Sequence, residues 1–215
     1  MARKVEFYID EYYHVFNRGV DGRKVFLDQG DIIYFLDSII IANQVSRMLS
    51  NGKEKQRKNE RNRARNNEPL VKVVAYAILP NHFHLVLKEI KEGGISKFMQ
   101  KLGTSYTMYF NEKYERSGAL FQGRFKATHV ADLTAVSSYV NLNFKHHNIN
   151  TGKQLVRTSW FEYIESSSAQ ELVCDRKEVE FIVRASGGVS KYKKDAKHWS
   201  GIFIETHQQD RNFEL

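Results

Sequence analysis

Hydrophobic and polar residues follow two different periods along this chain, and the periods separate predicted strands from predicted helices. Strand-type patterns, bounded mainly by glycine, proline or asparagine, occupy four segments: 11–17, 71–79, 82–89 and 120–130. Apolar residues at helical spacing predict four helices: 31–51, 93–118, 133–145 and 178–185. We expect Asp31 and Asp132 to cap two of these helices. Because strands and helices interleave irregularly, the pattern favours an α+β domain over a doubly wound parallel sheet.

The segment Leu79-Pro-Asn-His-Phe-His-Leu-Val-Leu87 carries two histidines at positions i and i+2 of a predicted strand. Side chains alternate across a strand, so His82 and His84 should leave one face while Phe83 and Leu85 leave the other. Two neutral imidazoles on one face can bind a divalent metal. Taken alone, such a pair is more often explained by packing or chance, so the metal interpretation depends on the rest of the chain.

The predicted helix over 133–145 carries a polar flank beside its apolar stripe. Tyr139 and Asn143 are four residues apart, so they should lie one turn apart on this flank. If the helix lies over the sheet face that bears His82 and His84, two imidazoles, one amide oxygen and one phenol could surround a shared ion.

Other residues of the same chemical types compete for these roles. Three further tyrosines are alternative nucleophiles, and the first two belong to an apolar helical stripe: Tyr106, Tyr109 and Tyr114. Four further histidines are not assigned to the metal: His14, His129, His146 and His147. His146 lies close to one turn beyond Asn143 and remains a candidate for proton transfer.

Charge points to a polyanionic partner. The 215 residues carry a formal net charge of +8 and have a pI of about 9.4. The stretch from Asn51 to Glu68, with seven basic and three acidic residues, contributes 7 − 3 = +4. It has no apolar residue larger than alanine, so we expect a flexible loop or a solvated helical extension. A solvated charged loop and direct contact with nucleic acid explain its charge about equally well.

Two classes of protein are disfavoured by the sequence. No apolar run reaches the roughly 20 residues that span a bilayer, and the amino terminus lacks the apolar core of a secretory signal, so we expect a cytoplasmic protein without membrane contact. The single Cys174 excludes an internal disulfide framework and a multi-cysteine zinc site.

Five segments carry a resemblance to a known family, and they occur in this order: Asn17-Arg18-Gly19, Leu79 to Leu87, Tyr109-Phe-Asn-Glu-Lys-Tyr114, Gly118-Ala-Leu-Phe-Gln-Gly-Arg-Phe-Lys126 and Ser138-Tyr-Val-Asn-Leu-Asn143. Together they closely resemble the single-tyrosine HUH transposases, especially the REP-associated tyrosine transposase branch. The resemblance covers roughly Val5 to Glu165.

This resemblance implies a fold and a domain division. The expected fold is the HUH version of a ferredoxin-like α+β domain, a central antiparallel sheet with packed helices, over residues 1–165. Residues 166–215 would form a C-terminal extension, in which the segment Lys191 to Trp199 either grips DNA or docks on the domain through Trp199 and Phe203. Many relatives have proline after the helix asparagine, where this chain has Phe144, so we expect the helix to continue.

The resemblance also implies site residues and a cofactor. His82 and His84 would be the histidine pair that holds Mg²⁺ or Mn²⁺, with Asn143 as a third ligand. Tyr139 would be the nucleophile that cleaves single-stranded DNA and forms a 5′-phosphotyrosine link, so that a 3′-hydroxyl can later rejoin strands in DNA transposition.

The expected partner is single-stranded or hairpin DNA, bound by a monomer or a homodimer. Candidate DNA contacts lie on the first turn and on a polar strand face: Asn17, Arg18, Gln122, Arg124 and Lys126. A structural turn and a solvated strand face would explain the same residues without DNA. Two other functions stay open, a hairpin-binding protein that no longer cleaves and a nickase of replication or conjugation.

Overall fold

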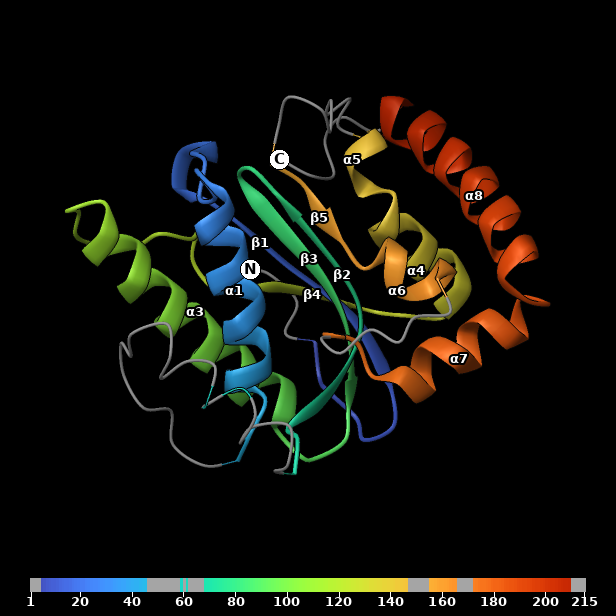
Figure 1. Cartoon of the computed structure of the whole chain (residues 1–215), viewed down its shortest axis with the longest axis horizontal. Coiled ribbons are helices and arrows are strands. Elements are labelled where there is room, and N and C mark those ends of the chain that lie inside the picture. Colours follow the sequence, from blue (N-terminus) through green and yellow to red (C-terminus); the bar gives the residue numbers. More distant parts are fainter. Residues whose placement is uncertain are drawn as a thin grey trace.

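In the computed structural model, a five-stranded antiparallel sheet carries helices on both faces (Figure 1). The structure describes residues 5–45, 59, 61, 68–146, 155–165 and 172–209. The strands are β1 (Tyr12–Arg18), β2 (Val71–Leu79), β3 (His82–Glu89), β4 (Lys126–His129) and β5 (Arg157–Thr158). The helices are η1 (Val20–Gly22), α1 (Gln29–Ala42), α3 (Gly94–Lys113), α4 (Leu133–Asn141), α5 (Asn143–His146), α6 (Trp160–Ile164), α7 (Arg176–Ala185) and α8 (Val189–Gln209).

The sheet order is β4-β1-β3-β2-β5, and every pair of neighbouring strands is antiparallel. Leaving the single turn η1 aside, the first six elements run β1-α1-β2-β3-α3-β4, with β3 inserted between β1 and β2. This connectivity is that of a ferredoxin-like fold. The predicted α+β class with a central antiparallel sheet is therefore confirmed.

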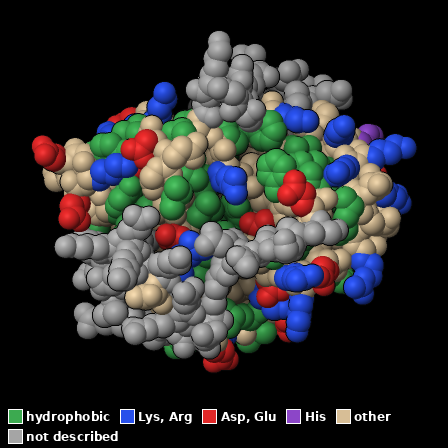
Figure 2. Space-filling model, viewed as in Figure 1, with side chains coloured by type: hydrophobic (Ala, Val, Ile, Leu, Met, Phe, Trp, Pro, Cys, Tyr) green, Lys and Arg blue, Asp and Glu red, His purple; other side chains and the backbone are tan. Residues whose placement is uncertain are grey.

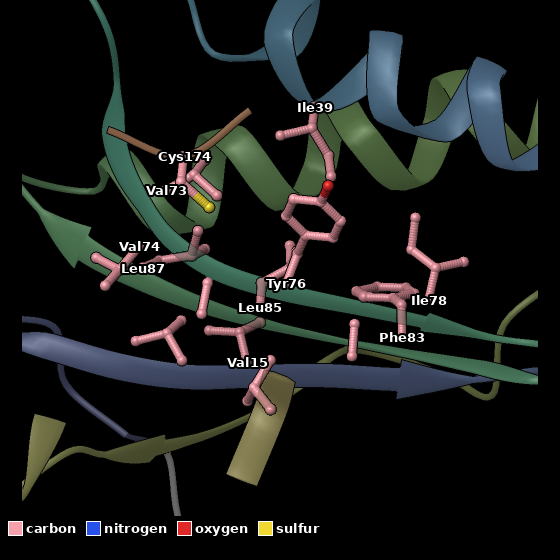
Figure 3. Close-up of a cluster of buried hydrophobic side chains, with 14 of the residues drawn as sticks. Val15, Ile39, Val73, Val74, Tyr76, Ile78, Phe83, Leu85, Leu87 and Cys174 are labelled. Atoms are coloured by element: carbon pink, nitrogen blue, oxygen red, sulfur yellow. The ribbon is translucent and has the colours of Figure 1, made fainter. Parts of the chain in front are cut away.

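The two faces of the sheet have different chemistry. On one face, Phe83 of β3 packs against Phe35 of α1, with ring centroids 5.0 Å apart, within a core shared with α3. Figure 3 shows Ile78 and Phe83 projecting from the sheet toward α1, which carries Ile39. The other face bears both histidines of β3 and is covered by α4. Period-two alternation along β3 thus separates an apolar face from a polar one.

The hairpin between β2 and β3 is predicted well because its turn is encoded locally. The two strands end and begin at Leu79 and His82 as expected, with Pro80-Asn81 between them. The register shifts between Val73 and Ala75, which marks an irregularity within β2. Gly93 adopts φ +69° where α3 begins, a backbone conformation that glycine tolerates without strain.

Several predicted elements have different limits in the structure, and the helix expected over 93–118 ends at Lys113. The strand expected over 120–130 is confined to β4. Gly123 at φ +66° interrupts the extended backbone, and Phe121 makes only an isolated bridge to Gly19. The first helix is capped by Asp28 rather than Asp31, which instead sits three residues inside and completes a capping box. Its described part ends at Ala42, before the predicted limit at residue 51.

The helix expected over 133–145 is interrupted. As predicted, Asp132 caps it by accepting a hydrogen bond from Ala135 N at 2.9 Å, but Leu142 leaves helical geometry at φ −109° and ψ 15°. All residues over 137–143 are buried, so packing on every side of the helix end outweighs the local preference to continue.

Several sequence features lie partly or wholly outside the described residues. Of the charged stretch 51–68, the structure describes residues 59, 61 and 68, and Arg61 pairs with Asp37 at 2.7 Å. The serine run 166–168 is not described. Within the described residues, no helix is long and apolar enough to cross a membrane.

Helix α8 has one side buried against the domain and another side that carries positive charge. Tyr192 and Ala196 are buried against the domain, whereas Trp199 is half-buried and the side chain of Phe203 is not described. The opposite side carries four exposed lysines: Lys191, Lys193, Lys194 and Lys197. Figure 2 shows Lys and Arg side chains along the edge of the molecule where α7 and α8 lie. Among the described side chains of this helix, Tyr192 is a fully buried aromatic residue and Trp199 is half-buried.

Helix α7 is tied to the sheet by a buried carboxylate. Glu178 accepts hydrogen bonds from Tyr12 Oη and Lys72 Nζ, both at 2.7 Å. Burial would raise the pKa of Glu178, but the bonds from Lys72 and Tyr12 outweigh it and hold the pKa below its usual value. The ionised form is therefore favoured by folding.

We expect Glu178→Gln to weaken the dependence of stability on acid. A carboxyl whose pKa is lowered by folding contributes stability above its unfolded pKa, near 4.5, and loses it as pH falls through the folded value. The wild-type protein should therefore lose more unfolding free energy between pH 7 and pH 3 than the variant, as measured by urea denaturation. At pH 7 the variant should be less stable by about 1–3 kcal/mol.

Glu180→Gln is the matched control on the same helix. Glu180 pairs with Arg176 at 2.8 Å in an exposed i,i+4 arrangement, which contributes less than about 0.5 kcal/mol. Equal acid profiles for wild type and Glu178→Gln would contradict the role of this carboxylate.

Candidate active site

The two histidines of β3 lie on the sheet face that α4 covers. In the antiparallel register, His82 lies opposite Arg18 of β1 and His84 lies opposite Phe16. Paired residues share a face, so these four side chains leave the sheet on the same side. The two imidazole centroids are 5.1 Å apart, and His84 is buried. Their common face follows from the strand period alone.

Tyr139 meets this histidine pair from the helix above. Its ring centroid is 5.9 Å from that of His84 and 5.7 Å from that of His14, and both contacts are edge-on. Only 6% of the surface of Tyr139 is exposed. The structure thus brings together a phenol and imidazoles from segments more than fifty residues apart in the sequence.

His14 is a member of the site that sequence reasoning missed. Its Nε2 atom lies 2.8 Å from Nδ1 of His84, within hydrogen-bonding distance. On the other histidine, Nδ1 of His82 lies 2.7 Å from Oδ1 of Asn81. Strand alternation puts His14 on the same face as Phe16. The sequence does not show which strand β1 pairs with, so nothing in it links His14 to His84.

These contacts suit a metal-binding pair. A ligating histidine commonly uses its second ring nitrogen for a hydrogen bond that fixes its orientation, and here Nδ1 of each ring makes such a contact. A metal would then bind each ring through Nε2. A group of three or more His, Cys, Asp or Glu side chains suited to a metal is absent among the described residues. The third ligand that the sequence resemblance implies, Asn143, is an amide.

Asn143 is a buried amide that fits such a role chemically. It begins α5 directly after the helix break, and its side chain is fully buried. Neither its oxygen nor its nitrogen has a hydrogen-bond partner within the described residues. A buried polar group left in this state costs about 1–3 kcal/mol, which a bound cation or water would offset. No described contact joins this amide to His82 or His84.

The candidate DNA contacts lie around the end of β1. Arg18 Nε donates to Gln122 Oε1 at 2.5 Å, and Asn17 Nδ2 donates to the carbonyl of Gly123 at 3.3 Å. Lys126 Nζ lies 6.0 Å from the centroid of the Phe16 ring, which in turn stacks 5.5 Å from that of His84.

Arg124 and Lys126 are both exposed. The structure therefore places the cationic strand end beside the histidine face.

The alternative residues lie elsewhere. The three other tyrosines, from α3 or just after it, have hydroxyls that bond on the opposite side of the sheet, Tyr106 to the Val25 carbonyl and both Tyr109 and Tyr114 to Asp31. His129 pairs with Glu11 at 2.7 Å. The side chain of His146 and all of His147 lie outside the described residues.

The central part of the chain is similar to a known protein family. A family model described as "Transposase IS200 like" matches residues 38–143, a span that contains both strand histidines and Tyr139. A search of curated proteins finds no match. A solved structure described as a REP-associated tyrosine transposase bound to a REP hairpin aligns with a TM-score of 0.47 and 14% identity, covering 70% of this chain and 77% of that one.

We expect His14→Phe to weaken divalent metal binding at the histidine pair by about 10- to 100-fold, because phenylalanine cannot make the hydrogen bond that orients His84, while the ring volume is roughly kept. Isothermal titration with Mn²⁺ measures this change.

His129→Phe is the control, since His129 lies on β4 and pairs with Glu11 away from the site. Equal Mn²⁺ affinity for wild type and His14→Phe would show that His14 does not support a metal ligand.

Proposed function

We propose that this chain, whose residues 38–143 match the model of IS200-like transposases, cleaves and rejoins single-stranded DNA through Tyr139. The observation that carries the proposal is the position of the Tyr139 ring, 5.9 Å from His84 and on the same side of the sheet as His82. The phenol that would act as the nucleophile and the two imidazoles that would bind the metal therefore lie on one side of the sheet. The same arrangement is the one that the sequence resemblance implies.

The proposed reaction is a transfer of one phosphoryl group to tyrosine and back. The Tyr139 hydroxyl oxygen attacks the scissile phosphorus and loses its proton, while the bond to the 3′ oxygen breaks and that oxygen gains a proton. The products are a 5′-phosphotyrosine link and a free 3′-hydroxyl. Because the link conserves the phosphodiester, attack by a 3′-hydroxyl reverses the step and joins strands without an energy source.

His82 and His84 are the proposed holders of Mg²⁺ or Mn²⁺, with the Asn143 amide as the proposed third donor. When bound, such an ion would polarise the phosphoryl oxygens and stabilise the charge that develops on them. His14 and Asn81 would orient the two imidazoles through the Nδ1 contacts at 2.8 and 2.7 Å. Burial of His84 would limit the access of water to this side of the site.

We expect Tyr139→Phe to abolish a covalent protein–DNA adduct, because the variant keeps the ring but has no nucleophilic oxygen. The measurement is denaturing electrophoresis after incubation with hairpin-flanked single-stranded DNA and Mn²⁺. Chelation of the metal with EDTA should abolish the adduct in the wild-type protein as well.

Tyr114→Phe is the control, since the Tyr114 hydroxyl bonds Asp31 on the far side of the sheet. An adduct that survives Tyr139→Phe would sink the proposal. Unimpaired hairpin binding with no product on any DNA tested would instead favour a binding protein that no longer cleaves.

The proposed DNA path runs from the cationic strand end to the histidine face. Lys126 lies beside Phe16, and the Phe16 ring stacks on His84. A phosphate bound by Lys126 would therefore lie close to the histidine face. Arg124 is exposed two residues earlier. Hairpin DNA is the proposed substrate, and the bases of its single-stranded flank could stack on aromatic rings here.

We expect Arg124→Ala and Lys126→Ala each to weaken DNA binding and to make it less sensitive to salt. Removing one cation that neutralises a phosphate of single-stranded DNA should reduce the slope of log Kd against log salt by about 0.7. Fluorescence anisotropy over a series of NaCl concentrations measures both effects. Lys97→Ala, an exposed lysine on α3, is the control, and identical slopes for all three variants would contradict this DNA path.

A further inference from the structure

Helix α4 is held from two sides, and Tyr139 is on only one of them. Helix α4 lies between the sheet and α8 (Figure 1). Tyr139 contacts His84 of the sheet, whereas Ser137 and Asn141 contact Tyr192 of α8. At 3.6 residues per turn, residues two positions away from Tyr139 point about 160° from it. The residues that contact α8 are therefore on the back of the helix, directly behind the tyrosine.

One side chain of α8 binds this back face. Tyr192 is fully buried, and its hydroxyl lies 3.2 Å from Ser137 Oγ and 3.0 Å from Asn141 Nδ2. Its ring packs against Tyr163, with centroids 5.0 Å apart. A single oxygen atom of α8 thus contacts two residues of α4.

The chemistry of the amide fixes the direction of one of these bonds. Ser137 Oγ also lies 3.0 Å from the carbonyl of Thr134, and when it donates there it accepts from Tyr192. Asn141 donates its amide N–H to the Tyr192 oxygen. Burial raises the pKa of Tyr192 to about 12, so the hydroxyl stays protonated and can serve both partners at neutral pH.

The same network reaches the sheet. Asn141 Oδ1 accepts from Ser159 Oγ at 2.6 Å, and Ser159 Oγ accepts from the backbone N–H of Tyr76 in β2 at 3.0 Å. Rotation of α4 about its axis would break the bonds to Tyr192 and to Ser159 together. The helix is thus fixed in rotation relative to the sheet that carries the histidines.

We propose that Tyr192 is a positioning residue for Tyr139: its hydroxyl holds the rotation of α4 that aims the tyrosine at the histidine face. This inference rests on the proposed function of Tyr139 and extends it to a residue outside the matched family segment, 38–143. An atom about 6 Å from a helix axis moves about 1 Å when the helix turns by about 10°. A misplacement of that size can slow a reaction roughly 100-fold.

The test compares two tyrosines that each lose one buried hydroxyl. Tyr192→Phe keeps the ring but loses both bonds to α4. Tyr106→Phe loses a bond to the Val25 carbonyl, 2.6 Å long, on the opposite side of the sheet. We expect Tyr192→Phe to slow single-turnover adduct formation roughly 10- to 100-fold, with hairpin affinity unchanged, and Tyr106→Phe to leave the rate as in wild type.

A second variant tests whether the effect passes through α4. Ser137→Ala removes one partner of the Tyr192 hydroxyl, and its effect on the rate is measured in two backgrounds. In the wild-type background it should slow adduct formation by a larger factor than in the Tyr192→Phe background, where the bond is already lost. Fully additive losses would show that Tyr192 acts by another route. A melting temperature recorded for every variant separates loss of folding from loss of rate.

A readout that needs no activity completes the experiment. Nuclear Overhauser cross-peaks between the rings of Tyr139 and His84, whose centroids are 5.9 Å apart, should weaken in Tyr192→Phe and persist in Tyr106→Phe. Unchanged cross-peaks and an unchanged rate in Tyr192→Phe would overturn the positioning role. If wild type forms no adduct, the proposed function fails, and the cross-peaks still decide whether Tyr192 orients Tyr139.

Discussion

The antiparallel register of β3 between β1 and β2 is the constraint on which the rest of the structure depends. It pairs His84 with Phe16 on one side and with Ala77 on the other, so every second residue of three strands shares one face. The alternate residues, such as Phe83, enter the core under α1. A slip of one residue would exchange the two sets, placing the imidazoles against α1 and the apolar core residues against α4. The site and the core therefore stabilise the same register.

The second constraint is the double attachment of α4. Its sheet side carries Tyr139, and its outer side is bound by α8 through hydroxyl and amide groups rather than through aliphatic packing. Hydrogen bonds have preferred directions, so this interface defines the rotation of the helix better than apolar contact would. The C-terminal helices, tied to the sheet through Glu178 and to α4 through Tyr192, are in this view part of the apparatus that holds the site.

Particular residues show how far local patterns carried the predictions. The hairpin from β2 to β3 and the cap at Asp132 were predicted because their signals lie within a few residues. The helix break at Leu142 was not predicted. The chain has Phe144 where many relatives have proline, so no local signal ends the helix, and burial on all sides decides the break. His14 was left out of the site because its contact with His84 spans 70 positions of sequence.

The sequence by itself determined the β2–β3 hairpin, the common face of His82 and His84, and the match of residues 38–143 to a family model, since these depend on short periods and ordered motifs. Only the tertiary structure decided that Tyr139 lies over those histidines, that His14 lies within hydrogen-bonding distance of His84, and that Tyr192 lies behind the helix that carries Tyr139. The physical reason is that strand pairing and helix docking join residues far apart in the chain, and local periodicity carries no information about which distant segments meet.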